Sequence, residues 1–290
     1  MDIRNIKTPQ PEVKDGAYLE ALFDIQANLM EGYYKIEGLP RPPLDINLKE
    51  TQVILKDFSS RVIEEIAEGY ESTNYAIDIC RQQVGWNLSL LNDEQKQMVL
   101  NHLQNSNEEM ADATAFFTEL MMYANIKPSD IYNYINLNLK DNVPGLKTPV
   151  SNLNEVMLVG ISILLQNHPE FVQGIHEYPV FDEVVDPEKR DKVHKYIPGF
   201  NNLTHYKHRM EALLIWEIAF HLNIGRNFLK NKTWKQSGEM TNELEYQEQV
   251  VLGFIKYCGY LLCVGFTAET LFHLCWRKNQ VNVFRQESNY

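Results

Sequence analysis

The sequence lacks the signatures of the common nucleotide-binding and zinc-binding folds. Alternating runs of β-branched residues are scarce, and no glycine-rich loop of the P-loop or dinucleotide-binding type is present. These absences argue against a β-sheet protein, a Rossmann domain or a P-loop enzyme. The four cysteines, which show no paired spacing of the zinc-ribbon kind, are Cys80, Cys258, Cys263 and Cys275. We expect them to be buried free thiols in a reducing compartment.

The chain also lacks a recognisable export or membrane signal. Residues 1–16 are polar and contain no apolar core of a signal peptide. The most apolar stretch, residues 250–266, contains Lys256 and is short for a membrane span. Because 39 acidic residues outnumber 27 basic ones, the net charge is -12, which disfavours duplex DNA and anionic membranes as partners. We therefore expect a cytoplasmic protein with no nucleic-acid partner and no membrane partner.

Helical periodicity is abundant, because apolar residues recur three and four positions apart over long stretches. We expect helices at residues 17–36, 49–84, 93–123, after Pro128, and at 205–230, 242–264 and 267–280. Asn92 or Asp93 should cap the third of these helices, which we expect to pause near Asn105. The pattern predicts an all-α fold, a helical bundle formed by a single domain over residues 1–290. Prolines and the length of the loops indicate an insertion or arm around residues 140–204.

Two of the expected helices each carry a pair of acidic residues at a spacing of three. Glu65 and Glu68 form the first pair, and Glu109 and Asp112 form the second. Residues three apart project from the same side of a helix, and apolar neighbours place both pairs at the border of a buried face. Like charges so placed repel one another, which a nearby positive group would relieve.

The chemistry of these side chains favours a hard divalent cation. Carboxylate oxygens from two facing helices suit Mg²⁺ or Mn²⁺, and no His or Cys accompanies them as a zinc site would prefer. The core of a helical bundle is a usual place for such a site. We predict a Mg²⁺ site, with Mn²⁺ possible, and two separate solvated acidic faces are the alternative.

The C-terminal residues concentrate positive charge in an otherwise acidic chain. Arg277, Lys278 and Arg285 lie close together there, with Asn279 and Asn282 on one helical face. Arginine and lysine bind phosphate oxygens, and asparagine can hydrogen-bond to a sugar or a base. A basic helix end that only complements the helix dipole is the alternative.

Taken in order, the ExxE motif, the ExxD motif and the C-terminal KNxxNxxRQ motif followed by Tyr290 resemble the dimeric all-α dUTPases. That family belongs to the all-α nucleoside-triphosphate pyrophosphohydrolases, which include phage dCTPases, and the segment ILKDFSSRVIEEIAEGYES is similar to bacteriophage-encoded members. The resemblance covers residues 20–71, 107–125 and 265–290. It implies a helical bundle of that family's type, a homodimer, and hydrolysis of a nucleotide.

The resemblance also implies roles for individual residues. Glu65, Glu68, Glu109 and Asp112 would be the Mg²⁺ ligands, and Glu65 is our candidate to orient or deprotonate the attacking water. Lys278, Asn279, Asn282 and Arg285 would hold the phosphates and the sugar. Gln26 would lie near the base. The family usually has an asparagine four residues after that glutamine, but Met30 stands there, and Asn28 lies nearby.

A basic segment between two expected helices supplies two further candidates. Trp234 would stack on a base or shape the pocket, and Lys235 would contact a phosphate. A loop with one anchoring tryptophan is the alternative interpretation.

The resemblance, together with these residues, implies Mg²⁺-dependent hydrolysis of a pyrimidine deoxynucleoside triphosphate to its monophosphate and pyrophosphate. We expect dUTP as the substrate, with dCTP or a modified pyrimidine nucleotide as the nearest alternative. Uracil and cytosine differ at the N3/C4 edge, and a side-chain amide can satisfy either by flipping. A catalytically silent regulatory protein on the same fold is a third alternative. Such a protein would be expected to have lost the carboxylates, and all four matching carboxylates are present here.

Overall fold

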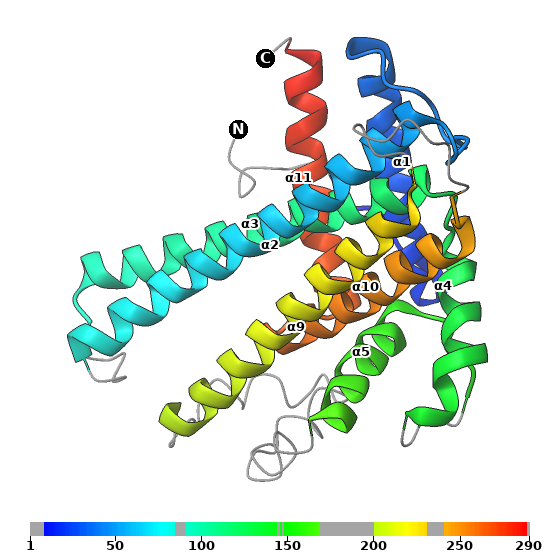
Figure 1. Cartoon of the computed structure of the whole chain (residues 1–290). Helices are drawn as coiled ribbons and strands as arrows, with labels where there is room; N and C mark the ends of the chain where they lie inside the picture. Colours follow the sequence, from blue (N-terminus) through cyan, green and yellow to red (C-terminus); the bar gives the residue numbers. More distant parts are fainter. Residues whose placement is uncertain are drawn as a thin grey trace.

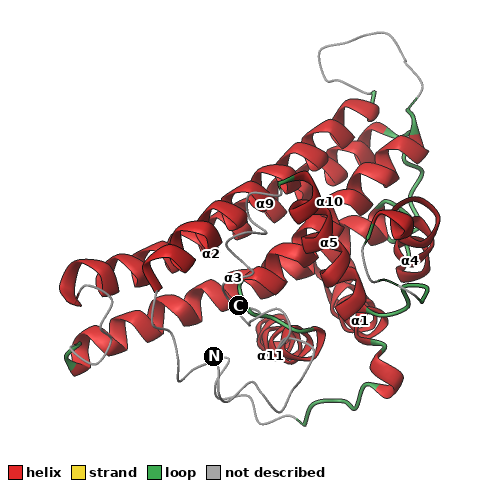
Figure 2. Cartoon of the chain, turned by 90° about the horizontal axis from the view of Figure 1, so that it is seen from below, coloured by secondary structure: helices red, strands yellow, loops and turns green. Residues whose placement is uncertain are grey.

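The structure, a computed structural model, describes residues 9–84, 91–143, 146, 148–168, 200–230 and 241–288. Within these ranges the chain forms eight α-helices and no strand (Figures 1 and 2), which confirms the prediction of an all-α helical bundle. The helices are α1 (Tyr18–Ile36), α2 (Lys49–Val84), α3 (Asp93–Tyr123), α4 (Pro128–Tyr134), α5 (Leu153–Asn167), α9 (Phe200–Phe228), α10 (Glu243–Cys263) and α11 (Ala268–Glu287).

The long helices α2 and α3 lie side by side and run in opposite directions, and they form the most extensive contact in the molecule (Figure 1). Helices α9 and α10 form a second pair, and α5 packs against α10. Helix α1 lies beside α11, and both contact α3. Helix α3 is therefore central, because α2, α10, α1 and α11 all pack against it.

Local sequence determines where α3 begins. The Asn92 side chain accepts a hydrogen bond from the Gln95 backbone N–H (2.8 Å), and the Gln95 side chain accepts one from the Asn92 backbone N–H (3.0 Å). This reciprocal capping box satisfies two of the backbone donors that a helix start leaves without partners. The predicted cap at Asn92 is confirmed.

The predicted pause near Asn105 is wrong, because α3 continues without interruption from Asp93 to Tyr123. Asn105 donates from Nδ2 to the Ser72 hydroxyl (2.8 Å), and the hydroxyls of Ser106 and Thr73 lie 2.8 Å apart. Polar side chains of this kind interrupt a helix when they bind their own backbone. Here they bind α2 instead, so they join the two helices and leave α3 intact.

Helix α11 is longer than predicted, ending at Glu287 rather than near residue 280. Its later turns are held against α1 by two hydrogen bonds to backbone carbonyl groups. Asn279 Nδ2 donates to the Ile25 oxygen (3.0 Å), and Gln286 Nε2 donates to the Leu29 oxygen (3.1 Å). Because tertiary contacts of this kind outweigh weak local propensity, the basic C-terminal residues belong to one continuous helix.

Aromatic packing fixes α3 against α10 in the core. Phe117 is fully buried, with its ring stacked on Tyr257 at 5.3 Å between centroids and edge-on to Phe254 at 5.4 Å. The Tyr257 hydroxyl donates to the Met110 carbonyl oxygen (2.8 Å), so the polar end of the ring is also satisfied. Burying one such ring contributes about 1.5–3 kcal/mol. The segment of α3 around Met110 is thereby held rigidly in place.

All four cysteines are free, and three are buried while Cys263 is partly exposed. In the described ranges no single helix is both long and apolar enough to cross a membrane, and only the bent pair α10 and α11 meets those criteria jointly, by length and composition.

Of the predicted insertion at 140–204, the described helix α5 contributes buried residues to the core, whereas residues 169–199 lie outside the described part of the chain.

Helices α5 and α10 approach each other at a pair of glycines. A Cβ added to Gly160 would lie 2.2 Å from the Ile255 carbonyl oxygen and 2.7 Å from the Gly259 backbone nitrogen. Both of these atoms belong to the backbone of α10, so they cannot move aside as a flexible side chain would. The absence of a side chain at Gly160 is what allows the close packing of these helices.

We predict that Gly160→Ala lowers the free energy of unfolding by about 2 kcal/mol or more, because the added methyl forces two backbones apart. Gly253→Ala is the matched control, since its Cβ would meet side-chain atoms of Leu222 and Phe117 at 3.4 Å or more. Replacing a helical glycine by alanine there should be neutral or stabilise by up to about 1 kcal/mol. Urea denaturation measures both, and a Gly160→Ala variant as stable as wild type would contradict the prediction.

Candidate active site

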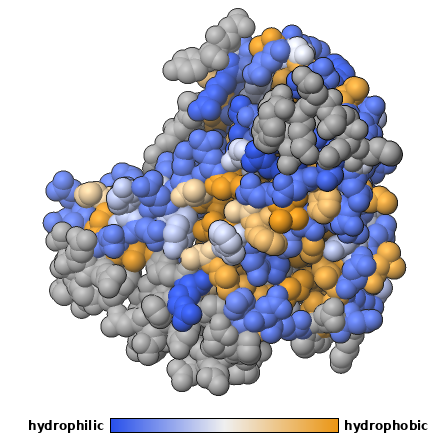
Figure 3. All heavy atoms as spheres, in the orientation of Figure 1, coloured by the Kyte–Doolittle hydropathy of each residue, from blue (hydrophilic) through white to orange (hydrophobic). Residues whose placement is uncertain are grey.

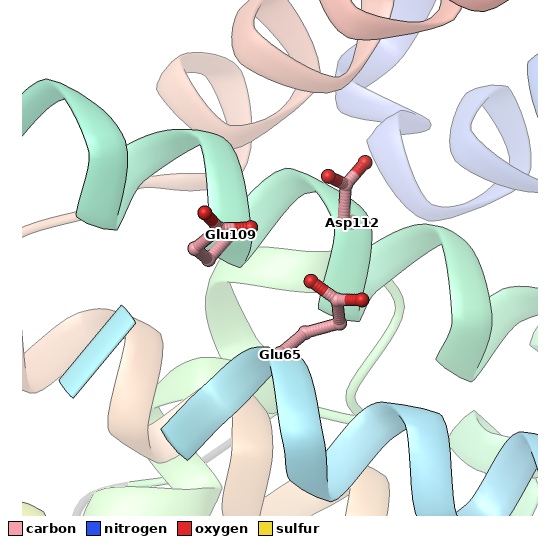
Figure 4. A group of neighbouring side chains, drawn as sticks. All are labelled: Glu65, Glu109 and Asp112. Carbon is pink, nitrogen blue, oxygen red and sulfur yellow. The ribbon is translucent and has the colours of Figure 1, made fainter. Parts of the chain in front are cut away.

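Three carboxylates from two helices meet in the middle of the α2–α3 pair. Glu65 comes from α2, and Glu109 and Asp112 come from α3 (Figure 4). One carboxylate oxygen of each residue lies within 4.8 Å of those of the others. We call these three residues the acidic cluster. A set of oxygen donors this close together is the arrangement that a hard divalent cation requires.

A glycine allows the two helices to approach closely next to this cluster. A Cβ on Gly69 would lie 2.3 Å from Met110 Cε and 3.3 Å from the Ser106 carbonyl oxygen. Antiparallel packing at this distance lets Glu109 and Asp112, one turn apart on α3, face Glu65 across the helix pair. The sequence spacing and the tight crossing together produce the cluster.

Glu68, the fourth predicted ligand, is exposed and lies outside the acidic cluster. Its negative charge nevertheless contributes to raising the pKa of both Glu65 and Glu109, so it lies near enough to interact with them. The structure therefore brings together three of the four predicted metal ligands. The fourth lies outside because burial of Val62 and Ile66 sets the rotation of α2 so that Glu65, rather than Glu68, is turned toward α3.

Burial and mutual repulsion shift the proton affinities of the cluster. Burial, followed by the charge of Asp112 and a hydrogen bond with Glu109, raises the pKa of Glu65 from 4.5 to about 8. Burial also raises the pKa of Glu109 and of Asp112. Neighbouring carboxyl groups with raised pKa values are costly to ionise together, and such groups are characteristic of functional sites.

A lysine from α11 partly compensates the cluster. Lys278 Nζ lies 2.6 Å from Asp112 Oδ2 and 4.0 Å from Glu108 Oε2. Its charge opposes the effect of burial and lowers the pKa of Asp112, and Arg285 acts in the same direction. The C-terminal basic residues and the acidic pairs, far apart in the sequence, therefore converge in space. One ammonium group balances only part of the negative charge gathered there.

The other predicted residues of α11 are distributed around this lysine. Asn279 is buried, and its side chain binds the Ile25 carbonyl oxygen of α1. Asn282 is half-buried and accepts a hydrogen bond from Arg285 at 3.4 Å, and Arg285 itself is exposed. Asn279 thus holds two helices together, while Asn282 and Arg285 remain accessible to a ligand.

A small pocket of about 20 Å³ adjoins the cluster between α1, α3 and α11. Four predicted residues line it, and they are Gln26, Lys278, Asn279 and Asn282. Thr114 and Thr118 of α3 also line the pocket, and their hydroxyl groups donate to the Met110 and Thr114 carbonyl oxygens. Asn28 is exposed and does not line the pocket. The predicted residues Trp234 and Lys235 lie outside the described part of the chain.

A buried glutamate beside this pocket was not predicted from the sequence. Glu119 of α3 is 8% exposed, and it accepts a hydrogen bond from Gln26 Nε2 of α1. The sequence does contain an indication of this residue. Glu119 follows Asp112 by seven residues, or two helical turns, so it lies on the same face of α3. A carboxylate at that position within an apolar stripe needs a partner, and the partner is 93 residues away.

We predict that Glu65→Gln stabilises the protein at high pH when EDTA removes divalent cations. A carboxyl whose folded pKa is about 8 instead of 4.5 binds its proton more tightly in the folded state. Its contribution to stability therefore falls as pH rises from about 4.5 to 8, and the glutamine variant escapes this loss. Urea denaturation should show that the free energy of unfolding of the variant rises relative to that of wild type between pH 6 and pH 9.

Glu64→Gln is the control, because Glu64 is the adjacent residue on α2 and is exposed. The difference in free energy of unfolding between Glu64→Gln and wild type should be the same at pH 6 and at pH 9. If Glu65→Gln is less stable than wild type at pH 9, the carboxyl is not held in an unfavourable electrostatic environment.

Comparison with protein-family models, with curated proteins and with solved structures gives no match for this chain. The function is therefore inferred from the acidic cluster, from Lys278 and from the adjoining pocket, together with the ordered motifs of the sequence.

Proposed function

We propose that the chain is a Mg²⁺-dependent nucleoside-triphosphate pyrophosphohydrolase that cleaves a pyrimidine deoxynucleotide, with dUTP as the preferred substrate. The products would be the nucleoside monophosphate and pyrophosphate. The observation that carries the proposal is the convergence of Glu65, Glu109 and Asp112 with Lys278 beside a pocket containing Gln26. This combination would supply groups for a cation, for phosphate oxygens and for a base, with Lys278 common to the cluster and the pocket.

The three carboxylates of the acidic cluster would hold the cation, Mg²⁺ or Mn²⁺. All the donors are oxygen atoms and come from two helices. Burial raises the pKa of each carboxyl, and neighbouring carboxylates raise the pKa of Glu65 and Glu109 further. When bound, the metal would neutralise phosphate charge and lower the pKa of a coordinated water. Glu68, exposed on the same helix as Glu65, is available at the rim of the site.

The residues of the chain supply the remaining functions. Glu65, which alone comes from α2, orients the attacking water and accepts its proton. Lys278 forms an ion pair with Asp112 in this structure. Cation binding at Asp112 would leave the ammonium group of Lys278 free to contact a phosphate. Arg285 lies seven residues beyond Lys278 on the same face of α11, where it can stabilise charge on the leaving pyrophosphate.

Two alternatives to dUTP hydrolysis would use the same site with a different ligand. Hydrolysis of dCTP or of a modified pyrimidine nucleotide would use the same carboxylates and the same lysine. A silent regulatory protein would bind a nucleotide or another protein without turnover. The carboxylate pairing across α2 and α3 favours an enzyme, since repulsion of this kind has no stabilising role of its own.

A homodimer remains part of the proposal. Hydrophobic residues gather across the middle of the face seen in Figure 3, where they alternate with hydrophilic ones. The exposed apolar side chains include Trp216 and Phe220, one turn apart on α9. Exposed aromatic residues are enriched at protein–protein interfaces.

The direct test is pyrophosphate release from dUTP, dCTP, dTTP, dATP and dGTP, with Mg²⁺ and with EDTA. We expect Mg²⁺-dependent cleavage of dUTP, and Glu109→Gln and Asp112→Asn should each lower turnover by about a hundredfold or more. Glu94→Gln, at an exposed glutamate in the first turn of α3, should retain wild-type turnover.

Circular dichroism should show that both cluster variants keep their helices. Cleavage that persists in EDTA, or full activity in both cluster variants, would contradict the metal assignment. Binding of a nucleotide without cleavage would favour the regulatory alternative.

A further inference from the structure

The hydrogen bond between Gln26 and Glu119 fixes which end of an amide faces the pocket. Gln26 lies on α1 and lines the pocket, but it is only 5% exposed, and Glu119 lies behind it on α3. The amide nitrogen Nε2 donates to the Glu119 carboxylate. Among the described residues this is the hydrogen bond that the Gln26 side chain makes, so its carbonyl oxygen remains available to a ligand.

The chemistry of the partner removes the usual ambiguity of a glutamine. An isolated amide can present either its NH₂ group or its oxygen by rotating about its last bond. An ionised carboxylate has no hydrogen to donate, so it can pair only with the NH₂ group. Glu119 therefore holds the amide with its oxygen, a hydrogen-bond acceptor, toward the pocket.

An acceptor at this position distinguishes the two common pyrimidine bases. Uracil carries a hydrogen on N3 and a carbonyl oxygen at C4, whereas cytosine has an unprotonated N3 and an amino group at C4. Placed opposite N3 of the base, the oxygen of Gln26 would accept from N3–H of uracil but would meet a lone pair on N3 of cytosine. A site built to make a hydrogen bond discriminates strongly against a ligand that leaves its buried group without a partner.

We propose that Glu119 is a positioning residue that locks the Gln26 amide and thereby makes the site select 4-keto pyrimidine nucleotides over 4-amino ones. The proposal rests on the proposed function, and it assigns the base that the motifs alone leave open. Glu119 is not a catalytic residue, because it acts on the ligand only through Gln26.

The lock depends on the charge of Glu119. Burial raises the pKa of this carboxyl from 4.5 to about 7, although the hydrogen bond from Gln26 and the charge of Arg61 on α2 lower it. The other titratable groups that interact with it are Glu37 and the phenols of Tyr33, Tyr34 and Tyr123. Those phenols all have raised pKa values and stay neutral near pH 7.

Protonation of Glu119 would release the lock. A neutral carboxyl group has both a donor and an acceptor, so the Gln26 amide can then pair with it in either orientation. As pH falls through about 7, the preference for uracil over cytosine should therefore decline toward no preference. Uracil and cytosine do not themselves titrate between pH 6 and 8.5, so a change in this range belongs to the protein.

The experiment measures kcat/KM for dUTP and dCTP with Mg²⁺ from pH 6 to 8.5, for wild type and Glu119→Gln. The ratio of the two values cancels effects of pH on the catalytic groups, which act on both substrates alike. For wild type the ratio should rise with pH. For Glu119→Gln, which has a neutral side chain of the same shape, the ratio at pH 8.5 should be about tenfold lower and independent of pH.

Glu94→Gln on the same helix is the matched control, and it should keep the wild-type ratio and its rise with pH. An unchanged ratio in Glu119→Gln, or a wild-type ratio that is flat from pH 6 to 8.5, overturns the positioning role while leaving the hydrolase intact. The wild-type pH profile decides the question even if the variant does not fold. Absence of turnover of either nucleotide by wild type refutes the proposed function, and this inference with it.

Discussion

Electrostatic repulsion within the acidic cluster is the constraint on which the rest of the site depends. Three carboxylates lie within 4.8 Å of one another, although like charges at this distance oppose folding. They stay together because the packing around them is strong: the α2–α3 contact is extensive, and Phe117 and Tyr257 fix α3 to α10 from behind. The core therefore supplies the free energy that holds the site in an unfavourable state of charge. Lys278 relieves part of that strain and connects α11 to the site.

Much of the fold could be predicted from local pattern. The apolar spacing of α2 and the capping residues of α3 act over one or two turns, so they are visible in the sequence. The supposed break at Asn105 shows where this fails, since its side chain has a partner on α2 that lies 33 residues away. The length of α11 escaped prediction for the same reason, because contacts with the backbone of α1 stabilise its last turns.

The site could be predicted only as far as helix periodicity determines the direction in which each side chain projects. Glu109 and Asp112 could be paired from spacing, but the choice between Glu65 and Glu68 depends on how α2 is rotated about its axis. Burial of Val62 and Ile66 sets that rotation and turns Glu65 toward α3. Glu119 could not be assigned a role from sequence, because its meaning comes from Gln26 on a distant helix. A lone acidic residue in an apolar stripe is informative only once its partner is known.

The two hydrogen bonds from α11 to the backbone of α1 have a mechanical consequence. Because the side chains of Asn279 and Gln286 bind carbonyl groups of α1, the helices α1 and α11, which both line the pocket, form one body. Helix α3, which carries Asp112 and Glu119, forms the facing wall. This body is also joined to α3 at two points, because Gln26 of α1 donates to Glu119 and Lys278 Nζ of α11 lies 2.6 Å from Asp112 Oδ2. A change in the position of α1 or α11 relative to α3 would therefore alter both the acidic cluster and the Gln26–Glu119 hydrogen bond.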